Sequence, residues 1–195
     1  MQELLTRKQI RLKNYDYSLN GYYFVTVCSY NRESVFGEMI NNEKSVGANG
    51  CWPDNNAIQI KLNKFGLIVD EELKNTENIR HEIKLDRYMI MHNHLHCIII
   101  INRADGKFNR AASRPPLQIS NIVNRKQTLS SFVSGFKSVV TKRINILRDT
   151  PRKPVWQRSF YDHIIRNDRS LNAIREYITT NPENWENDID NLINL

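Results

Sequence analysis

Cysteine is scarce in this 195-residue chain, and long apolar runs are absent. Its three cysteines, Cys28, Cys51 and Cys97, are odd in number and widely separated, so neither a disulfide framework nor a zinc ribbon is indicated. No stretch approaches the roughly 18 apolar residues of a membrane-spanning helix, and the N-terminus lacks the apolar middle of a signal peptide. These absences predict a cytoplasmic protein with no membrane contact.

The chain also has few glycines, seven in all, and none of them forms a glycine-rich phosphate loop. Its length suits one domain with its own core. We therefore expect a single domain over residues 1–195, with long loops at about 41–57 and 103–128. Within the second loop, residues 105–128 contain Pro115, Pro116 and five basic residues, and we predict that this segment becomes ordered only when a ligand binds.

Positive charge is concentrated in one part of the chain. The formal charge is +7, but residues 103–169 hold fifteen lysines and arginines against four acids, so this stretch carries +11 and the remainder −4. Such asymmetry is expected of a surface that binds phosphates. A basic surface that is merely solvated would have the same composition, so charge alone leaves nucleic-acid binding open.

Four segments have the composition of β-strands. They are rich in aromatic and β-branched residues and are expected at 22–28, at 83–91 and 94–101 as the two arms of a hairpin, and at 155–165. His92 and Asn93 interrupt the long central segment with residues that suit a tight turn.

Three segments have the apolar spacing of helices. The first follows Asn63, a possible cap, and the last begins near Asp168, where Asp168 or Ser170 could be the cap, and ends at Asn181 before a proline. The middle helix has the strongest apolar stripe: Leu129, Phe132, Val133, Phe136, Val139, Val140, Ile144 and Leu147. Strand, helix, strand, strand, helix, strand is the split βαβ order. The fold class expected is α+β, ferredoxin-like or RRM-like, with an antiparallel sheet, helices on one face and an added C-terminal helix.

The most informative motif is His94-Leu-His96, at the start of the second hairpin strand. Residues i and i+2 of a strand project to one side, about 6.6 Å apart, so the two imidazoles can share one cation. His92 would lie about 13 Å from His96 on an unbroken strand, too far to share an ion. The alternative is a pair of half-buried histidines hydrogen-bonded to backbone or water.

Tyr177, in the last helix, is a candidate nucleophile. A phenol has a pKa of about 10, so it attacks at neutral pH only if a cation or a base stabilises the phenolate. Arg175 or a metal ion could provide this, and Asn181, one helical turn further on, could complete the ligand set. Tyr177 could equally be a packing tyrosine with its hydroxyl at the surface.

Several basic residues are candidates for phosphate contact, and all are equally compatible with solvation. They are Lys137, Lys142 and Arg143 on the middle helix, Arg158, His163 and Arg166 around the last strand, and Arg175.

The motif Asn93-His-Leu-His-Cys-Ile98, with Tyr88-Met-Ile-Met91 before it and Tyr177-Ile-Thr-Thr-Asn-Pro182 long after it, resembles the HUH single-tyrosine transposases. The greatest similarity is to REP-associated tyrosine transposases, also called transposase IS200-like proteins. Further matching segments lie between residues 11 and 185: Tyr15-Asp-Tyr-Ser18, Tyr23-Phe-Val-Thr26, Asn31-Arg32, Phe36-Gly37 and Val155 to Arg166. The family usually has proline where His92 stands, which argues against His92 as a ligand.

The resemblance implies a metal-dependent transesterase acting on single-stranded DNA with hairpin structure. His94 and His96 would bind Mg or Mn, Asn181 would match the polar residue one turn after the tyrosine, and Tyr177 would form a 5′-phosphotyrosine. The protein would act as a monomer, although some relatives are dimers. Two other functions stay open: a structured-DNA-binding protein that does not cut, and a metal-dependent nuclease that uses water.

Overall fold

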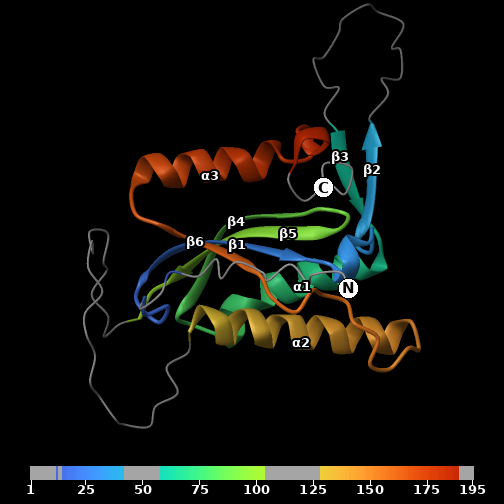
Figure 1. Cartoon of the computed structure of the whole chain (residues 1–195). Coiled ribbons are helices and arrows are strands. Elements are labelled where there is room, and N and C mark those ends of the chain that lie inside the picture. Colours follow the sequence, from blue (N-terminus) through green and yellow to red (C-terminus); the bar gives the residue numbers. More distant parts are fainter. Residues whose placement is uncertain (1–11, 13–14, 42–57, 104–127, 189–195) are drawn as a thin grey trace, which may run out of the picture.

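The structure is a computed structural model, and it describes residue 12 and residues 15–41, 58–103 and 128–188 (Figure 1). Four strands form the main sheet in the order β4-β5-β1-β6, all pairs antiparallel. Their bounds are β1 Gly21–Cys28, β4 Ile83–Ile90, β5 His94–Ile101 and β6 Tyr161–Ile165. The predicted α+β class, antiparallel sheet and central hairpin are confirmed.

The α-helices of the described residues lie on both faces of the sheet (Figure 1). Helices α1 (Lys64–Ile79) and α2 (Leu129–Leu147) cover one face of the sheet, and α3 (Asp168–Thr180) lies on the other. The larger apolar core lies on the α1–α2 side, and a smaller cluster forms under α3 from Phe24, Ile98, Ile165, Leu171 and Ile178. Both faces of β5 are therefore buried.

The predicted strand at 155–165 was too long. Val155 and Trp156 pack into the larger core, and the strand begins only at Tyr161. The Lys137 ammonium donates to the backbone carbonyl of Gln157 and, at 3.2 Å, to that of Arg158. Before these carbonyls the segment still pairs with the chain at the end of β1, through an isolated bridge between Ser29 and Trp156, but it does not form a continuous ladder with β6.

The helix caps and the apolar stripe of α2 can be compared with the sequence predictions. The last helix is capped by Asn167, whose side chain accepts from the Ser170 amide at 2.8 Å, and not by Asp168 or Ser170. On α2, Val139 and Leu147 are exposed, so the apolar stripe is narrower than predicted. The Asn63 cap is confirmed, since its side chain accepts from two amides of the first turn of α1.

A second, two-stranded sheet was not predicted. It pairs β2 (Gly37–Asn41) with β3 (Ile58–Leu62), five residues each. The predicted loops fall almost entirely at residues 42–57 and 104–127, outside the described residues, so the extent of the single domain stays a prediction.

Gly66 lets α1 approach the chain just before β2. A Cβ atom at Gly66 would lie 2.1 Å from the backbone oxygen of Phe36, whose side chain is fully buried against Trp156. We expect Gly66→Ala to destabilise the fold by about 1 to 3 kcal/mol, because helix and backbone must separate. Chemical denaturation measures this.

Gly135→Ala in α2 is the matched control. Among the described residues a Cβ there meets only the Arg80 guanidinium, at 3.4 Å, so the better helix propensity of alanine should stabilise the protein by about 0.5 to 1 kcal/mol. Equal effects of the two substitutions would contradict the close approach at Gly66.

Candidate active site

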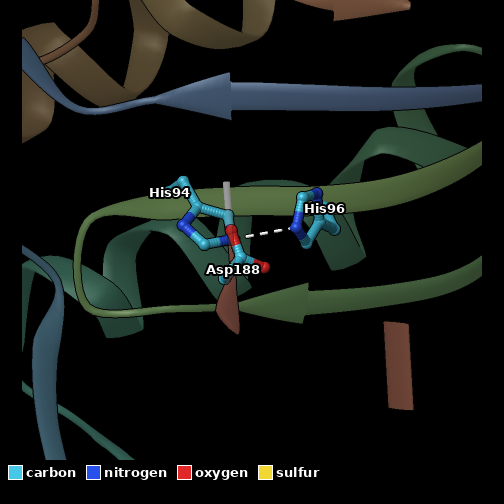
Figure 2. Close-up of side chains that lie close together, drawn as sticks. All are labelled: His94, His96 and Asp188. Atoms are coloured by element: carbon cyan, nitrogen blue, oxygen red, sulfur yellow. Dashed lines mark hydrogen bonds between the residues drawn. The ribbon is translucent and has the colours of Figure 1, made fainter. Parts of the chain in front are cut away.

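His94 and His96 lie at the start of β5, on the face of the sheet that carries α3. Their side chains are 0% and 1% exposed, and their Nε2 atoms are 2.9 Å apart. Figure 2 shows the two rings converging from one strand, with Asp188 beside them. The i, i+2 spacing therefore brings the two imidazoles together, as the sequence predicted.

The outer nitrogen of each ring has its own hydrogen-bond partner. His94 Nδ1 lies 2.8 Å from Asn93 Oδ1, and His96 Nδ1 lies 2.8 Å from Thr26 Oγ1 on β1. Such partners orient an imidazole and let its Nδ1 carry the proton, which leaves Nε2 as a lone-pair donor. Both Nε2 atoms are thereby presented to the same point.

Burial keeps both imidazoles neutral at physiological pH. It lowers the pKa of His96 from 6.5 to about 3. It also lowers the pKa of His94 well below its usual value, and the neighbouring His96 adds to the effect. A neutral imidazole is the form that coordinates a metal ion.

Asp188 completes this cluster, although nothing in the sequence pattern pointed to it. It follows the short 3-10 helix η2 (Trp185–Asn187), is 5% exposed, and offers a carboxylate oxygen within 4.8 Å of ligand nitrogens of His94 and His96. No periodicity or motif links residue 188 to the histidines. The turn after α3, which brings the chain back to the sheet, creates the contact.

The Tyr177 hydroxyl lies at the same point. It donates to Asp188 Oδ2 at 3.1 Å and is 3.3 Å from His96 Nε2. The Tyr177 ring packs against His96 and Phe24, yet the residue is 39% exposed. The phenol therefore contacts the histidine pair on one side and remains accessible from outside.

Asn181 is buried one turn after Tyr177. Its Nδ2 donates to Asp188 Oδ2, whereas its Oδ1 is buried without a hydrogen-bond partner among the described residues. A buried carbonyl oxygen without a partner is costly and is available to a cation. Two imidazoles, a carboxylate and an amide oxygen are a donor set that divalent ions accept.

His92 is not part of the cluster of ligand atoms found among the described residues. Its ring packs edge-on against Trp185, with centroids 4.4 Å apart, and the Trp185 ring stacks at 5.9 Å on His94. His92 and Trp185 together therefore line the site next to His94.

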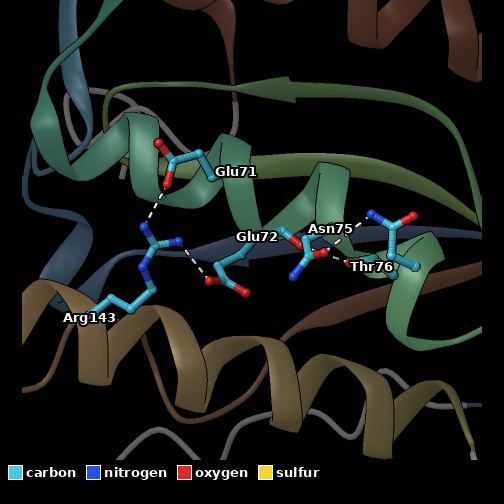
Figure 3. A network of polar contacts seen from close by, with 6 residues as sticks. Glu71, Glu72, Asn75, Thr76 and Arg143 are labelled. Atoms are coloured by element: carbon cyan, nitrogen blue, oxygen red, sulfur yellow. Dashed lines mark hydrogen bonds and ion pairs between the residues drawn. The ribbon is translucent and has the colours of Figure 1, made fainter.

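Three of the basic residues considered for phosphate contact are engaged within the protein. Arg143 bridges Glu71 and Glu72 on α1 at 2.5 and 2.7 Å, as Figure 3 shows, and Lys137 holds the carbonyls before β6. Arg175 holds Asp86 on β4 through two nitrogens, so its observed contacts do not serve the Tyr177 phenolate. Lys142, Arg158, His163 and Arg166 are exposed. Contact of any of these residues with DNA stays a prediction.

No protein-family model matches the chain. A protein of Haemophilus influenzae (strain ATCC 51907 / DSM 11121 / KW20 / Rd), described as uncharacterized, is 36% identical over 183 residues, covering 93% of this chain and 91% of that protein. The chain belongs to the same family as that protein.

A solved structure of a REP-associated tyrosine transposase bound to a REP hairpin has a similar fold. The TM-score is 0.55 at 17% identity, over 90% of this chain and 73% of that chain. At this identity the likeness establishes the fold. No helix in the described residues has the length and apolar character needed to cross a membrane.

Proposed function

We propose that this protein is a metal-dependent DNA strand transferase of the tyrosine transposase type. Its substrate would be single-stranded DNA bearing a hairpin, the ligand named for the structurally similar transposase. The observation that carries the proposal is the position of the Tyr177 hydroxyl, 3.3 Å from His96 Nε2 and in contact with Asp188. A packing tyrosine would not require a buried histidine pair and carboxylate at its hydroxyl.

In the proposed reaction the Tyr177 oxygen attacks a phosphodiester. A bond forms between that oxygen and phosphorus, and the bond from phosphorus to the 3′-oxygen breaks. The products are a 5′-phosphotyrosine and a 3′-hydroxyl, which takes up the proton released by the phenol. Rejoining is the same step reversed, so no nucleotide cofactor is consumed.

His94, His96 and Asp188 would hold a divalent ion, Mg or Mn, with Asn181 Oδ1 as a further ligand. The ion would act as a Lewis acid on a phosphoryl oxygen. The chain itself orients the phenol through Asp188 and packs its ring on Phe24. Because tyrosine and histidines of one chain already meet, we propose that a monomer is sufficient.

A covalent trapping assay tests the proposal. Nicked hairpin oligonucleotides with randomised single-stranded flanks are incubated with the protein and Mn²⁺, and protein-linked DNA is detected on a denaturing gel. We expect an adduct that chelator prevents. Cleavage without an adduct would indicate a nuclease using water, and binding without cleavage would indicate a binding protein; either outcome contradicts the proposal.

Thr26 should influence metal affinity without contacting the ion. Thr26→Val removes the hydroxyl that partners His96 Nδ1 at 2.8 Å. Loss of such an orienting partner lowers metal affinity by about 10- to 100-fold, and we expect this decrease in Mn²⁺ titration calorimetry. Thr180→Val, which removes a half-buried hydroxyl that donates to the Glu176 carbonyl within α3, is the control and should bind normally. Normal Mn²⁺ affinity in Thr26→Val would contradict the orienting role.

A further inference from the structure

Strand β6 carries two exposed side chains on the face of the candidate site. Within the sheet, Tyr161 pairs with Thr26 of β1, and Thr26 pairs with His96 of β5. His163 lies two residues further along β6, opposite Phe24. Since neighbouring strands are about 4.8 Å apart, Tyr161 lies roughly 10 Å across the sheet from the histidine pair.

Helix α3 leaves this edge of the sheet open. It packs over β4 and β5, and Tyr161 on β6 is 40% exposed. The rings nevertheless form a continuous strip: Phe24 lies edge-on to Tyr161 at 6.3 Å and to Tyr177 at 6.0 Å. Buried Phe24 thus lies between two exposed rings, that of the candidate nucleophile Tyr177 and that of Tyr161 at the open edge.

The charges around this edge are positive. Exposed Arg158 and Arg166 lie on either side of β6 in sequence, and neither belongs to an ion pair among the described residues. Asp162, the acidic residue within β6, is 5% exposed and lies on the face of the sheet opposite to Tyr161 and His163. Asp168, exposed at the start of α3, is the acid close in sequence to Arg166.

We propose that the open face of β6 binds single-stranded DNA next to the cleaved phosphate, with an unpaired base stacked on Tyr161. Exposed aromatic rings on a sheet bind unpaired bases, and flanking arginines attract the phosphates. This inference rests on the proposed function and adds Tyr161, a residue to which neither the site chemistry nor the sequence analysis assigns a role. His163 provides a second ring for the adjoining base, and Arg158 contacts the backbone.

The test measures binding without cleavage. Fluorescence anisotropy of labelled oligothymidylate is recorded in chelator at low salt, for wild type and for Tyr161→Ala, Tyr161→Phe and His163→Ala. We expect Tyr161→Ala to raise Kd about tenfold, since base–aromatic stacking contributes on that scale, and Tyr161→Phe to keep the wild-type Kd. His163→Ala should raise Kd as well. Ile146→Ala, 70% exposed on α2 in the other layer, is the control and should bind normally.

Two comparisons separate stacking from other causes. A blunt duplex has no unpaired base, so its affinity should be unchanged by Tyr161→Ala. Arg158→Gln should reduce the salt dependence of single-strand binding by about 0.7 for each phosphate that the protein no longer neutralises, whereas Tyr161→Ala should leave the slope unchanged.

An unaltered single-strand Kd in both Tyr161→Ala and His163→Ala would overturn the inference, as would an equal loss of affinity for single strand and duplex. Failure of the wild type to bind oligothymidylate would overturn it too. Because chelator prevents cleavage, the result is independent of the covalent assay. If the covalent adduct is missing but Tyr161→Ala still raises the single-strand Kd tenfold, the proposed strand transfer is contradicted and the proposed DNA-binding surface is supported.

Discussion

Tyr177→Phe should abolish the covalent protein–DNA adduct, because phenylalanine has no oxygen to attack phosphorus. The substitution keeps the ring that packs on Phe24 and His96, so folding and DNA affinity should remain close to wild type. The measurement is the denaturing gel used for the wild-type adduct, with thermal unfolding and anisotropy run on the same preparation.

Tyr161→Phe is a closely matched control. Tyr161 is 40% exposed and Tyr177 39%, and both rings contact Phe24. The control should form the adduct normally. An equal adduct from Tyr177→Phe would show that another residue is the nucleophile, and cleavage retained without an adduct would show that water is.

Removal of either imidazole, in His94→Ala or His96→Ala, should lower Mn²⁺ affinity by more than about 100-fold, beyond the effect expected for an orienting partner. The two imidazoles are neutral and their Nε2 atoms lie 2.9 Å apart, so each substitution removes one of two metal-ligating nitrogens from the same site. Titration calorimetry measures the affinity, and the adduct assay should fail in parallel.

Two other histidines act as controls for this metal prediction. His81 is exposed before β4, and His92 packs on Trp185 outside the cluster of ligand atoms. His81→Ala should bind Mn²⁺ normally, and His92→Ala should keep a saturable site. Loss of the site in His81→Ala, or its retention in both His94→Ala and His96→Ala, would contradict the proposed ligands.

The remaining two ligands can be ranked by charge. Asp188→Asn removes a negative charge from the site, whereas Asn181→Ala removes a neutral oxygen. Because the affinity of hard cations follows the charge of their ligands, Asp188→Asn should weaken Mn²⁺ binding more than Asn181→Ala. The reverse order would make the amide oxygen, proposed from the sequence, the principal third ligand.

Local patterns predicted much of the fold. The β-branched composition of β5, the apolar spacing of α1 and most of that of α2, and the break at His92-Asn93 each depend on neighbours in sequence, and the elements that they predicted were confirmed. Strand β6 was predicted too long because residues 155–160 have strand composition, while distant Lys137 binds the carbonyls of Gln157 and Arg158. Strand β2 shows no alternation, whereas β3 alternates apolar and polar residues over its five positions, a period-two signal that would have predicted this strand.

The same distinction applies to the site. His94 and His96 are neighbours on a strand, so their convergence followed from strand geometry alone. Asp188 was missed because its proximity depends on how the chain turns after α3, which no repeat in the sequence encodes. The sequence also does not show which basic side chains form ion pairs. Arg143 and Arg175 bind carboxylates about 70 and 90 residues away in the chain.

The two halves of the site differ in how firmly the backbone holds them. β5 has a hydrogen-bonded strand on each side, whereas Trp185 and Asp188 belong to a single short turn after the last helix. Amide hydrogen exchange should therefore be slow at the histidines and fast at the turn, since local opening is cheapest where few ladder bonds must break. An incoming metal ion or DNA strand would thus reach the histidines by displacing the turn, while the hydrogen bonds of the β-sheet remain intact.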